Sequence, residues 1–164
     1  MLLQFSVKNF RSFKDEVKLS LEASSDEALK SNFTNVGRES MLNAAVIFGA
    51  NASGKSNIFK AIAAAILIIR QSNSRQINQP LELIIPFLFD TETVQQPTSF
   101  EFYFYAEGVK YLYGFSATRK EIIEEYLYLY KTAKPSVIFE RKENNKYRFT
   151  DAAIKRELQP IIER

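Results

Sequence analysis

The most informative segment of the sequence is Gly49-Ala50-Asn51-Ala52-Ser53-Gly54-Lys55-Ser56. It fits the pattern G-x-x-x-x-G-K-[ST] at every fixed position, although the chain has only 5 glycines. The pattern predicts a P-loop, in which the glycines adopt backbone conformations that a Cβ would forbid and successive N–H groups turn towards phosphate oxygens. The alternative is a strand-to-helix turn that matches by chance, and the flanking segments help to decide between the two.

Both flanks have the composition that a P-loop requires. Residues 44–48 (Ala-Ala-Val-Ile-Phe) contain no polar side chain, which predicts a central strand covered on both faces. From Lys55 to about Arg70 the chain is rich in Ala, Ile and Leu and is apolar nearly all round, which predicts a buried helix. The start of that helix would add unpaired N–H groups and the positive end of its dipole, and residues 71–80 read as a loop.

The two polar residues that close the motif predict the chemistry. We expect Lys55, the candidate catalytic residue, to reach the β- and γ-phosphates of a nucleotide, and the Ser56 hydroxyl to coordinate magnesium. The predicted cofactors are therefore ATP and Mg²⁺. All eight residues of the motif and the following Asn57 are candidate nucleotide-binding residues.

The segments around this motif predict an antiparallel sheet. Residues 3–7 and 17–21 alternate apolar and polar side chains, which indicates two paired strands joined by a short turn, and the polar residues 22–40 read as a loop. Further on, 100–105 with 109–117 and 137–141 with 146–149 have the pattern of β-hairpins, and 122–130 alternates as well. A helix is expected from Asp151, with Thr150 or Asp151 as its N-cap and Pro160 near its end.

These elements predict a single domain of the α/β class with α+β character. A P-loop strand–helix core at about 1–75 would lie beside an antiparallel β-subdomain at about 80–150, and a further helix would start within 151–164. The absence of Cys and His excludes disulfides, thiolate nucleophiles, imidazole bases and the usual zinc sites. Without a secretory signal, and with no apolar run near the roughly 20 residues of a membrane span, we expect a cytoplasmic protein without membrane contact.

Several stretches besides the P-loop resemble a known family. They are Phe5–Phe13, Phe48–Asn57, Pro86–Asp90, Ser99–Phe102 and Tyr111–Phe115. Together they resemble the SMC, RecF and OLD group of ABC-type ATPases, and most closely its bacterial branch described as "AAA family ATPase". In that branch an Asn two places after the first P-loop glycine, here Asn51, and another after the Ser, here Asn57, are typical.

The resemblance implies an N-terminal ATP-binding lobe of an ABC-type ATPase head. Asn9, Arg11 and Ser12 fall where the family's N-terminal turn approaches the nucleotide, although Arg11 equally fits a solvated turn. The implied partners are a C-terminal lobe on the same or a separate chain, a second head that sandwiches ATP at a homodimer interface, and a nuclease and DNA. The implied setting is DNA maintenance or phage defence.

Several parts of such an ATPase are not found in the sequence. There is no Ser-Gly-Gly signature and no His switch, and Phe87–Glu92 only imitates the acidic strand that binds magnesium, so that Asp90 is either a metal ligand or an ordinary carboxylate. Gln159 is a candidate γ-phosphate sensor between lobes. We therefore expect a chain that stops before its second lobe, binds nucleotide weakly alone and turns over little.

Other functions fit the sequence less well. A small P-loop kinase would follow the motif with alternating parallel strands and helices, and a GTPase would carry Asn-Lys-x-Asp. A nucleotide-dependent binding module for nucleic acid or protein is the main non-enzyme alternative, because aromatic strand residues can stack on bases; these are Tyr126, Tyr128, Tyr130, Phe100, Phe102 and Phe104. Aromatic alternation more often fills a sheet core, and three carboxylates beside the tyrosines argue against phosphate there: Glu121, Glu124 and Glu125.

Overall fold

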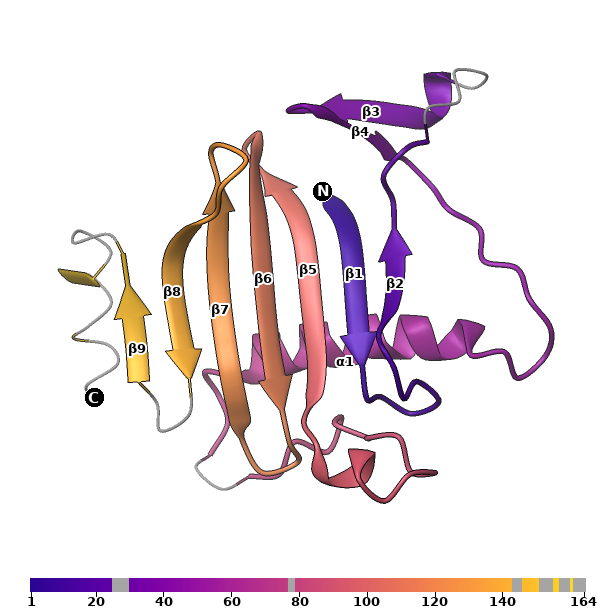
Figure 1. Ribbon diagram of the computed structural model, residues 1–164, viewed down its shortest axis with the longest axis vertical. Coiled ribbons are helices and arrows are strands. Elements are labelled where there is room, and N and C mark those ends of the chain that lie inside the picture. The colour runs from indigo at the N-terminus through magenta and orange to yellow at the C-terminus, as the bar shows by residue number, and fades with distance from the viewer. Residues whose placement is uncertain (25–29, 77–78, 143–145, 151–154, 157–159, 161–164) are drawn as a thin grey trace.

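The computed structural model describes residues 1–24, 30–76, 79–142, 146–150, 155–156 and 160, and Figure 1 shows them as a sheet with one long helix across its rear face. The described sheet has seven strands in the order β2-β1-β5-β6-β7-β8-β9, and every neighbouring pair is antiparallel. The strands are β1 (Leu2–Lys8), β2 (Val17–Ser20), β5 (Thr98–Ala106), β6 (Val109–Ala117), β7 (Ile122–Tyr130), β8 (Ser136–Lys142) and β9 (Lys146–Phe149). The architecture is therefore mixed α/β with an antiparallel sheet, and the strands predicted at 3–7, 17–21, 100–105, 109–117, 122–130, 137–141 and 146–149 are confirmed.

Alternating side chains give the sheet its apolar rear face. The register aligns Phe5 of β1 with Phe102 of β5, and Phe102 with Tyr113 of β6. One row further along, Val7 is opposite Phe100, so large apolar groups of neighbouring strands meet on the side that the helix covers. Burying these rings against the helix is the main force that holds the two layers together.

The helix α1 (Lys55–Gln71) confirms the predicted helix but not its complete burial. One stripe packs on the sheet, formed by Ile58, Ala61, Ala64, Ala65 and Ile68. The opposite stripe is open to solvent: Phe59 is 60% exposed and Ile66 is 43% exposed. The helix is apolar on all sides, but the sheet covers only one of them, so the other side exposes apolar side chains.

The predicted buried strand at residues 44–48 is wrong for this chain. The segment forms no regular element, and Val46 is 74% exposed and Phe48 is 88% exposed. Both neighbours of β1 are already taken, by β2 and β5, so this sheet has no place beside β1 for it. Only Ile47 of this segment packs partly against the core, and the other four residues are exposed, so apolar composition did not lead to burial here.

Residues 22–40 are not one continuous loop as predicted. They contain a short 3₁₀ turn at Lys30–Asn32 and a strand β3 (Phe33–Val36), which pairs with β4 (Glu39–Leu42) in a separate two-stranded sheet. Met41 of β4 is fully buried against Leu3 and Tyr105, which anchors this polar hairpin to the edge of the large sheet. A second 3₁₀ turn lies at Thr93–Gln95.

The predicted helix from Asp151 falls almost entirely on residues outside the described part of the chain, and Gln159 is among them. No statement about a γ-phosphate sensor therefore follows from the structure.

The front face of the sheet carries tyrosines whose hydroxyls are tied to carboxylates. Tyr126 donates a hydrogen bond to Glu101, and Tyr128 donates one to Glu140 at 2.6 Å. The two rings stack with centroids 5.0 Å apart, and Tyr126 lies directly over Gly114 of the neighbouring strand. Partial burial, followed by these hydrogen bonds to carboxylates, raises the pKa of both phenols.

Candidate functional site

The P-loop sequence forms a hollow at the N-terminal end of α1. A cavity of about 410 Å³ is lined by the seven consecutive residues 51–57. The chain reaches it from β4 along the extended segment that Figure 1 shows at the far end of the helix. The structure thus places a curved backbone directly before a long helix, which is one part of the context of a phosphate-binding loop, whereas the strand expected before the loop is not formed.

Gly54 shapes the junction between loop and helix. It is the N-cap of α1 and has φ 91°, a left-handed conformation that favours glycine. A Cβ here would lie 2.9 Å from Cε1 of Phe13, so the position also has no room for a side chain. Within the described residues, the backbone N–H groups of Gly54, Lys55 and Ser56 have no acceptor, and they are free to bind an anion.

Lys55 is held at the centre of the loop by backbone oxygens. Its Nζ donates to the carbonyl oxygens of Gly49 and Ala50, both at 2.6 Å, and lies 3.4 Å from Oγ of Ser53. A cation that satisfies its donors on loop carbonyls can exchange those partners for phosphate oxygens without leaving the loop. The geometry therefore fits a polyphosphate, and Lys55 is the residue that would bind its charge.

Ser56 and the outer loop residues are open to solvent. Asn51, Ala52, Ser53 and Ser56 are all exposed, and Ala52 has φ 64°, which is uncommon for a residue with a side chain. The Ser56 hydroxyl is thus available to a magnesium ion, which would neutralise phosphate charge when bound. Among the described residues there is no cluster of three or more acidic side chains that would hold the ion by itself.

The N-terminal turn packs against the P-loop through Ser12, one of the three residues, with Asn9 and Arg11, that were expected near the nucleotide. Asn57 donates from Nδ2 to Oγ of Ser12 at 2.8 Å. Arg11 lies next to Ser12 with φ 51°, and its guanidinium stacks 5.6 Å from the ring centroid of Phe10. No described contact joins that guanidinium to the loop, and its Nε is buried without a hydrogen-bond partner in the described part of the chain.

Asn9 holds the N-terminal turn in place by hydrogen bonds to residues 87–98, and the sequence analysis did not predict this role. The side chain is 1% exposed, and Nδ2 donates to the carbonyl oxygens of Thr93 at 2.6 Å and Gln96 at 2.9 Å. Its Oδ1 accepts the backbone N–H of Phe87 at 2.9 Å, and its own carbonyl accepts from the Thr98 hydroxyl at 2.7 Å. One amide thus joins the turn to a loop more than seventy residues away.

Asp90 has a structural role rather than that of a strand-end metal ligand. Residues 87–92 contain no strand, so the imitation of an acidic strand is not confirmed. The carboxylate accepts the N–H groups of Glu92 at 3.0 Å and Thr93 at 3.1 Å and forms an ion pair with Lys14. The hydrogen bond from Lys14, followed by that from Thr93, lowers the pKa of Asp90 to about 2.

We expect Gly54→Ala to lower the free energy of unfolding by about 2 kcal/mol and to weaken nucleotide binding, because alanine resists positive φ and its Cβ would meet Phe13. Urea denaturation measures the first effect. Gly108→Ala is the matched control, since Gly108 has φ 75° but nothing within 4 Å of a Cβ. Equal losses in the two variants would contradict the proposed contact with Phe13.

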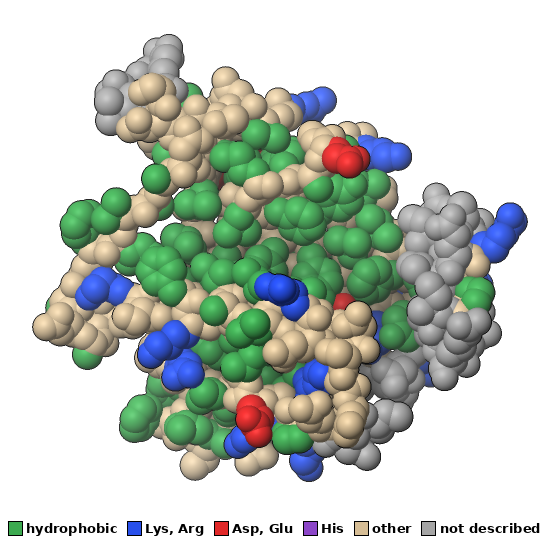
Figure 2. Space-filling view, turned by 180° about the vertical axis from the view of Figure 1, so that it is seen from behind, with side chains coloured by type: hydrophobic (Ala, Val, Ile, Leu, Met, Phe, Trp, Pro, Cys, Tyr) green, Lys and Arg blue, Asp and Glu red, His purple; other side chains and the backbone are tan. Residues whose placement is uncertain are grey.

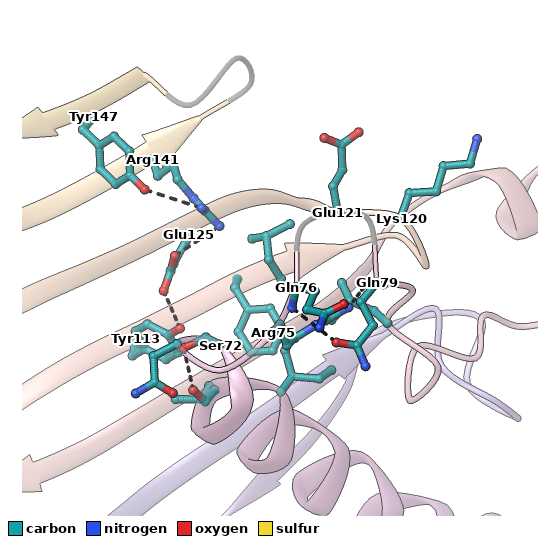
Figure 3. Close-up of a pocket in the computed structure, with 16 residues that line it drawn as sticks. Ser72, Arg75, Gln76, Gln79, Tyr113, Lys120, Glu121, Glu125, Arg141 and Tyr147 are labelled. Atoms are coloured by element: carbon teal, nitrogen blue, oxygen red, sulfur yellow. Dashed lines mark hydrogen bonds and ion pairs between the residues drawn. The ribbon is translucent and has the colours of Figure 1, made fainter. Parts of the chain in front are cut away.

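A larger cavity than that of the P-loop, about 740 Å³, lies at the other end of α1 and is drawn in Figure 3. A row of polar groups crosses its floor: Tyr113 donates to Glu125 at 2.7 Å, Glu125 pairs with Arg141 at 3.3 Å, and Arg141 is 3.5 Å from the Tyr147 hydroxyl. The charges of Glu125 and Arg141 balance one another. We assign no site there.

We compared the chain with known proteins and protein families. No helix in the described part of the chain is long and apolar enough to cross a membrane. A search of curated proteins found no match. The family model described as "AAA domain, putative AbiEii toxin, Type IV TA system" matches residues 44–155, which include the P-loop, α1 and most of the sheet. The chain belongs to this family of AAA domains, for which nucleotide binding and ATPase activity are the expected functions.

Proposed function

We propose that this chain binds ATP with Mg²⁺ at the P-loop and is one lobe of an ABC-type ATPase head. The observation that carries the proposal is the loop geometry: Lys55 Nζ is held by two loop carbonyls at 2.6 Å beside a helix start whose N–H groups have no acceptor among the described residues. A triphosphate supplies the acceptors for both sets of donors. The membership of a family of AAA domains supports the same function.

Within the proposed site each residue has a separate task. The N–H groups at Gly54, Lys55 and Ser56 bind phosphate oxygens, with the helix dipole favouring their charge. The Lys55 ammonium moves from the carbonyls of Gly49 and Ala50 to the β- and γ-phosphates. Ser56 supplies a hydroxyl to magnesium, and Ser12, which already contacts Asn57 at 2.8 Å, brings the N-terminal turn to the site.

Hydrolysis in this proposal needs a C-terminal lobe, from the same or a separate chain. Support comes from the uncovered apolar surface around the P-loop: Val46 is 74% exposed, Phe48 is 88% exposed and Phe59 is 60% exposed. Figure 2 shows hydrophobic side chains gathered over this side of the molecule. Large apolar patches on a protein surface mark interaction sites. We therefore propose that a second lobe packs on this patch and covers the exposed side chains of residues 44–48.

The finer parts of the proposal follow from the resemblance. Two completed heads would sandwich two ATP molecules in a homodimer, with Arg11 and Asn51 near the nucleotides, and would drive a conformational change in a DNA-maintenance or phage-defence system that includes a nuclease. A small kinase fits less well, because antiparallel hairpins rather than parallel strands follow the P-loop.

Calorimetric titration of ATP and magnesium into the chain tests the binding. We expect saturable binding that weakens at least tenfold in Lys55→Ala, because hydrogen bonds to charged groups contribute about 1.5–3 kcal/mol each. Lys60→Ala is the matched control: it removes an exposed lysine from the same helix, away from the loop, and should leave the affinity within about twofold.

Two results would contradict the proposal. One is binding by the parent chain that Lys55→Ala leaves unchanged, which would place the nucleotide elsewhere. The other is the absence of binding even when the exposed apolar surface is covered by a co-expressed C-terminal lobe, which would leave the loop as a structural turn.

A further inference from the structure

Three turns meet at the end of the sheet where the N-terminus lies in Figure 1, and a cleft of about 460 Å³ opens between them. We call it the tip cleft. Its walls are Arg38 and Glu39 from the β3–β4 hairpin, Lys110 from the β5–β6 hairpin, and Tyr130 and Lys131 from the end of β7. All its lining residues are among those that the structure describes, and none belongs to the P-loop.

The charge of the tip cleft is positive and partly unpaired. Glu39 is the only carboxylate in its lining, and it accepts from Lys110 Nζ at 2.6 Å and from the Tyr105 hydroxyl at 3.1 Å. Arg38 and Lys131 are exposed and have no ion-pair partner in the described part of the chain. Two cations from different turns are therefore available to anionic groups that enter the cleft.

The tip cleft also contains a tyrosine that differs from the others on its strand. Tyr126 and Tyr128 are tied to carboxylates, whereas Tyr130 lies 6.0 Å from Lys110 Nζ and 6.3 Å from the ring of Tyr103. Tyr130 is half-buried, it shares the cleft lining with Arg38 and Lys131, and Lys110 is the cation that lies against its ring. Carboxylates that would repel phosphate thus lie beside Tyr126 and Tyr128 in the middle of β7, and not beside Tyr130 at its end.

We propose that the tip cleft binds single-stranded nucleic acid, with Arg38 and Lys131 on successive phosphates and a base stacked on Tyr130. Basic groups that follow a backbone, combined with an aromatic ring for a base, are the two elements of such sites. Single strands are favoured over duplex because a base reaches the Tyr130 ring only when it is unpaired. The site does not depend on ATP binding at the P-loop.

Fluorescence anisotropy with a labelled oligothymidylate of roughly 16 nucleotides, at the upper end of what one small binding fold contacts, tests the proposal without nucleotide. We expect Arg38→Gln with Lys131→Gln to weaken binding about tenfold or more and to reduce the slope of log K against log salt by about 0.7 for each cation removed. Tyr130→Leu should weaken binding roughly tenfold through lost stacking.

A charge-matched control separates the cleft from overall charge. Lys60→Gln with Lys120→Gln removes two exposed lysines elsewhere, on α1 and in the β6–β7 turn, and should leave the affinity nearly unchanged. Glu107→Gln should strengthen binding, because this exposed carboxylate is next to Gly108 in the cleft lining. Lys55→Ala should bind the strand normally, so failure of ATP binding and failure of this site are distinguishable.

Several outcomes would overturn the proposal. These are equal weakening in the two double variants, tighter binding to a duplex of the same length, and binding to phosphatidylserine vesicles but not to the oligonucleotide. Thermal melts of each variant confirm that a lost signal reflects lost binding and not lost folding. A folded tip variant with unchanged affinity would equally reject the site.

Discussion

Gly114→Ala is expected to lower the free energy of unfolding by about 3 kcal/mol, although it adds a single methyl group to a strand. A Cβ at this position would lie 2.3 Å from Cζ of Tyr126 and 2.4 Å from its hydroxyl oxygen. The ring would have to leave the sheet, and it would lose both its hydrogen bond to Glu101 and its stacking on Tyr128. Urea denaturation followed by circular dichroism measures the change.

A double-mutant cycle tests this cause. In a Tyr126→Ala background the added methyl group meets no ring, so Gly114→Ala should then cost less than about 1 kcal/mol. Tyr126→Phe keeps the ring but removes the hydroxyl, and it isolates the contribution of the bond to Glu101. If Gly114→Ala costs the same in both backgrounds, the effect arises from the strand backbone and the explanation fails.

Asn9→Ala is expected to destabilise the chain by about 4 kcal/mol. The change removes the donor and the acceptor that serve Thr93, Gln96 and Phe87. It leaves the Thr93 carbonyl buried, and the Gln96 carbonyl and the Phe87 N–H partly buried, without these partners. Because the same turn carries Ser12 to the P-loop, nucleotide affinity should fall as well. Hydrogen exchange at the Phe87 amide, together with denaturation, measures the loss of the hydrogen bonds made by the Asn9 side chain.

The backbone of Asn9 allows a matched control. Its φ of 53° suits glycine better than alanine, so Asn9→Gly removes the same side chain without backbone strain and should cost about 1 kcal/mol less than Asn9→Ala. A small loss in Asn9→Gly would show that strain, and not the hydrogen bonds of the amide, accounts for the effect.

The parts of the fold that were predictable are those with local patterns. Alternation of apolar and polar side chains identified β1, β2 and β7, and the hairpin pattern identified β5 with β6 and β8 with β9. The P-loop motif placed the start of α1 at Lys55, where the structure has it. The family resemblance implied Ser12, and the P-loop motif indicated Asn57, as neighbours of the proposed nucleotide site, and the structure places their side chains 2.8 Å apart.

The parts that were missed depend on distant partners. The β3–β4 hairpin is polar, with Asn35 opposite Ser40, and one buried Met41 side chain fixes it to the sheet. The amide of Asn9 finds its partners 78 to 88 positions away, and nothing next to it in the sequence marks them. Residues 44–48 have the composition of a buried strand, but a segment is buried only if other elements pack against it, and composition does not identify those elements.

The exposed segment before the P-loop, residues 44–48, would couple ATP binding to the association of the two lobes in the assembly that we propose. Residues 44–48 form no regular element, and within this described segment only Ile47 packs partly against the core, whereas the other end of the loop continues into α1. In the assembly that we propose, a second lobe that orders this segment also orders the loop. Reciprocity then requires ATP to tighten association of the lobes by the same factor as the lobe tightens ATP.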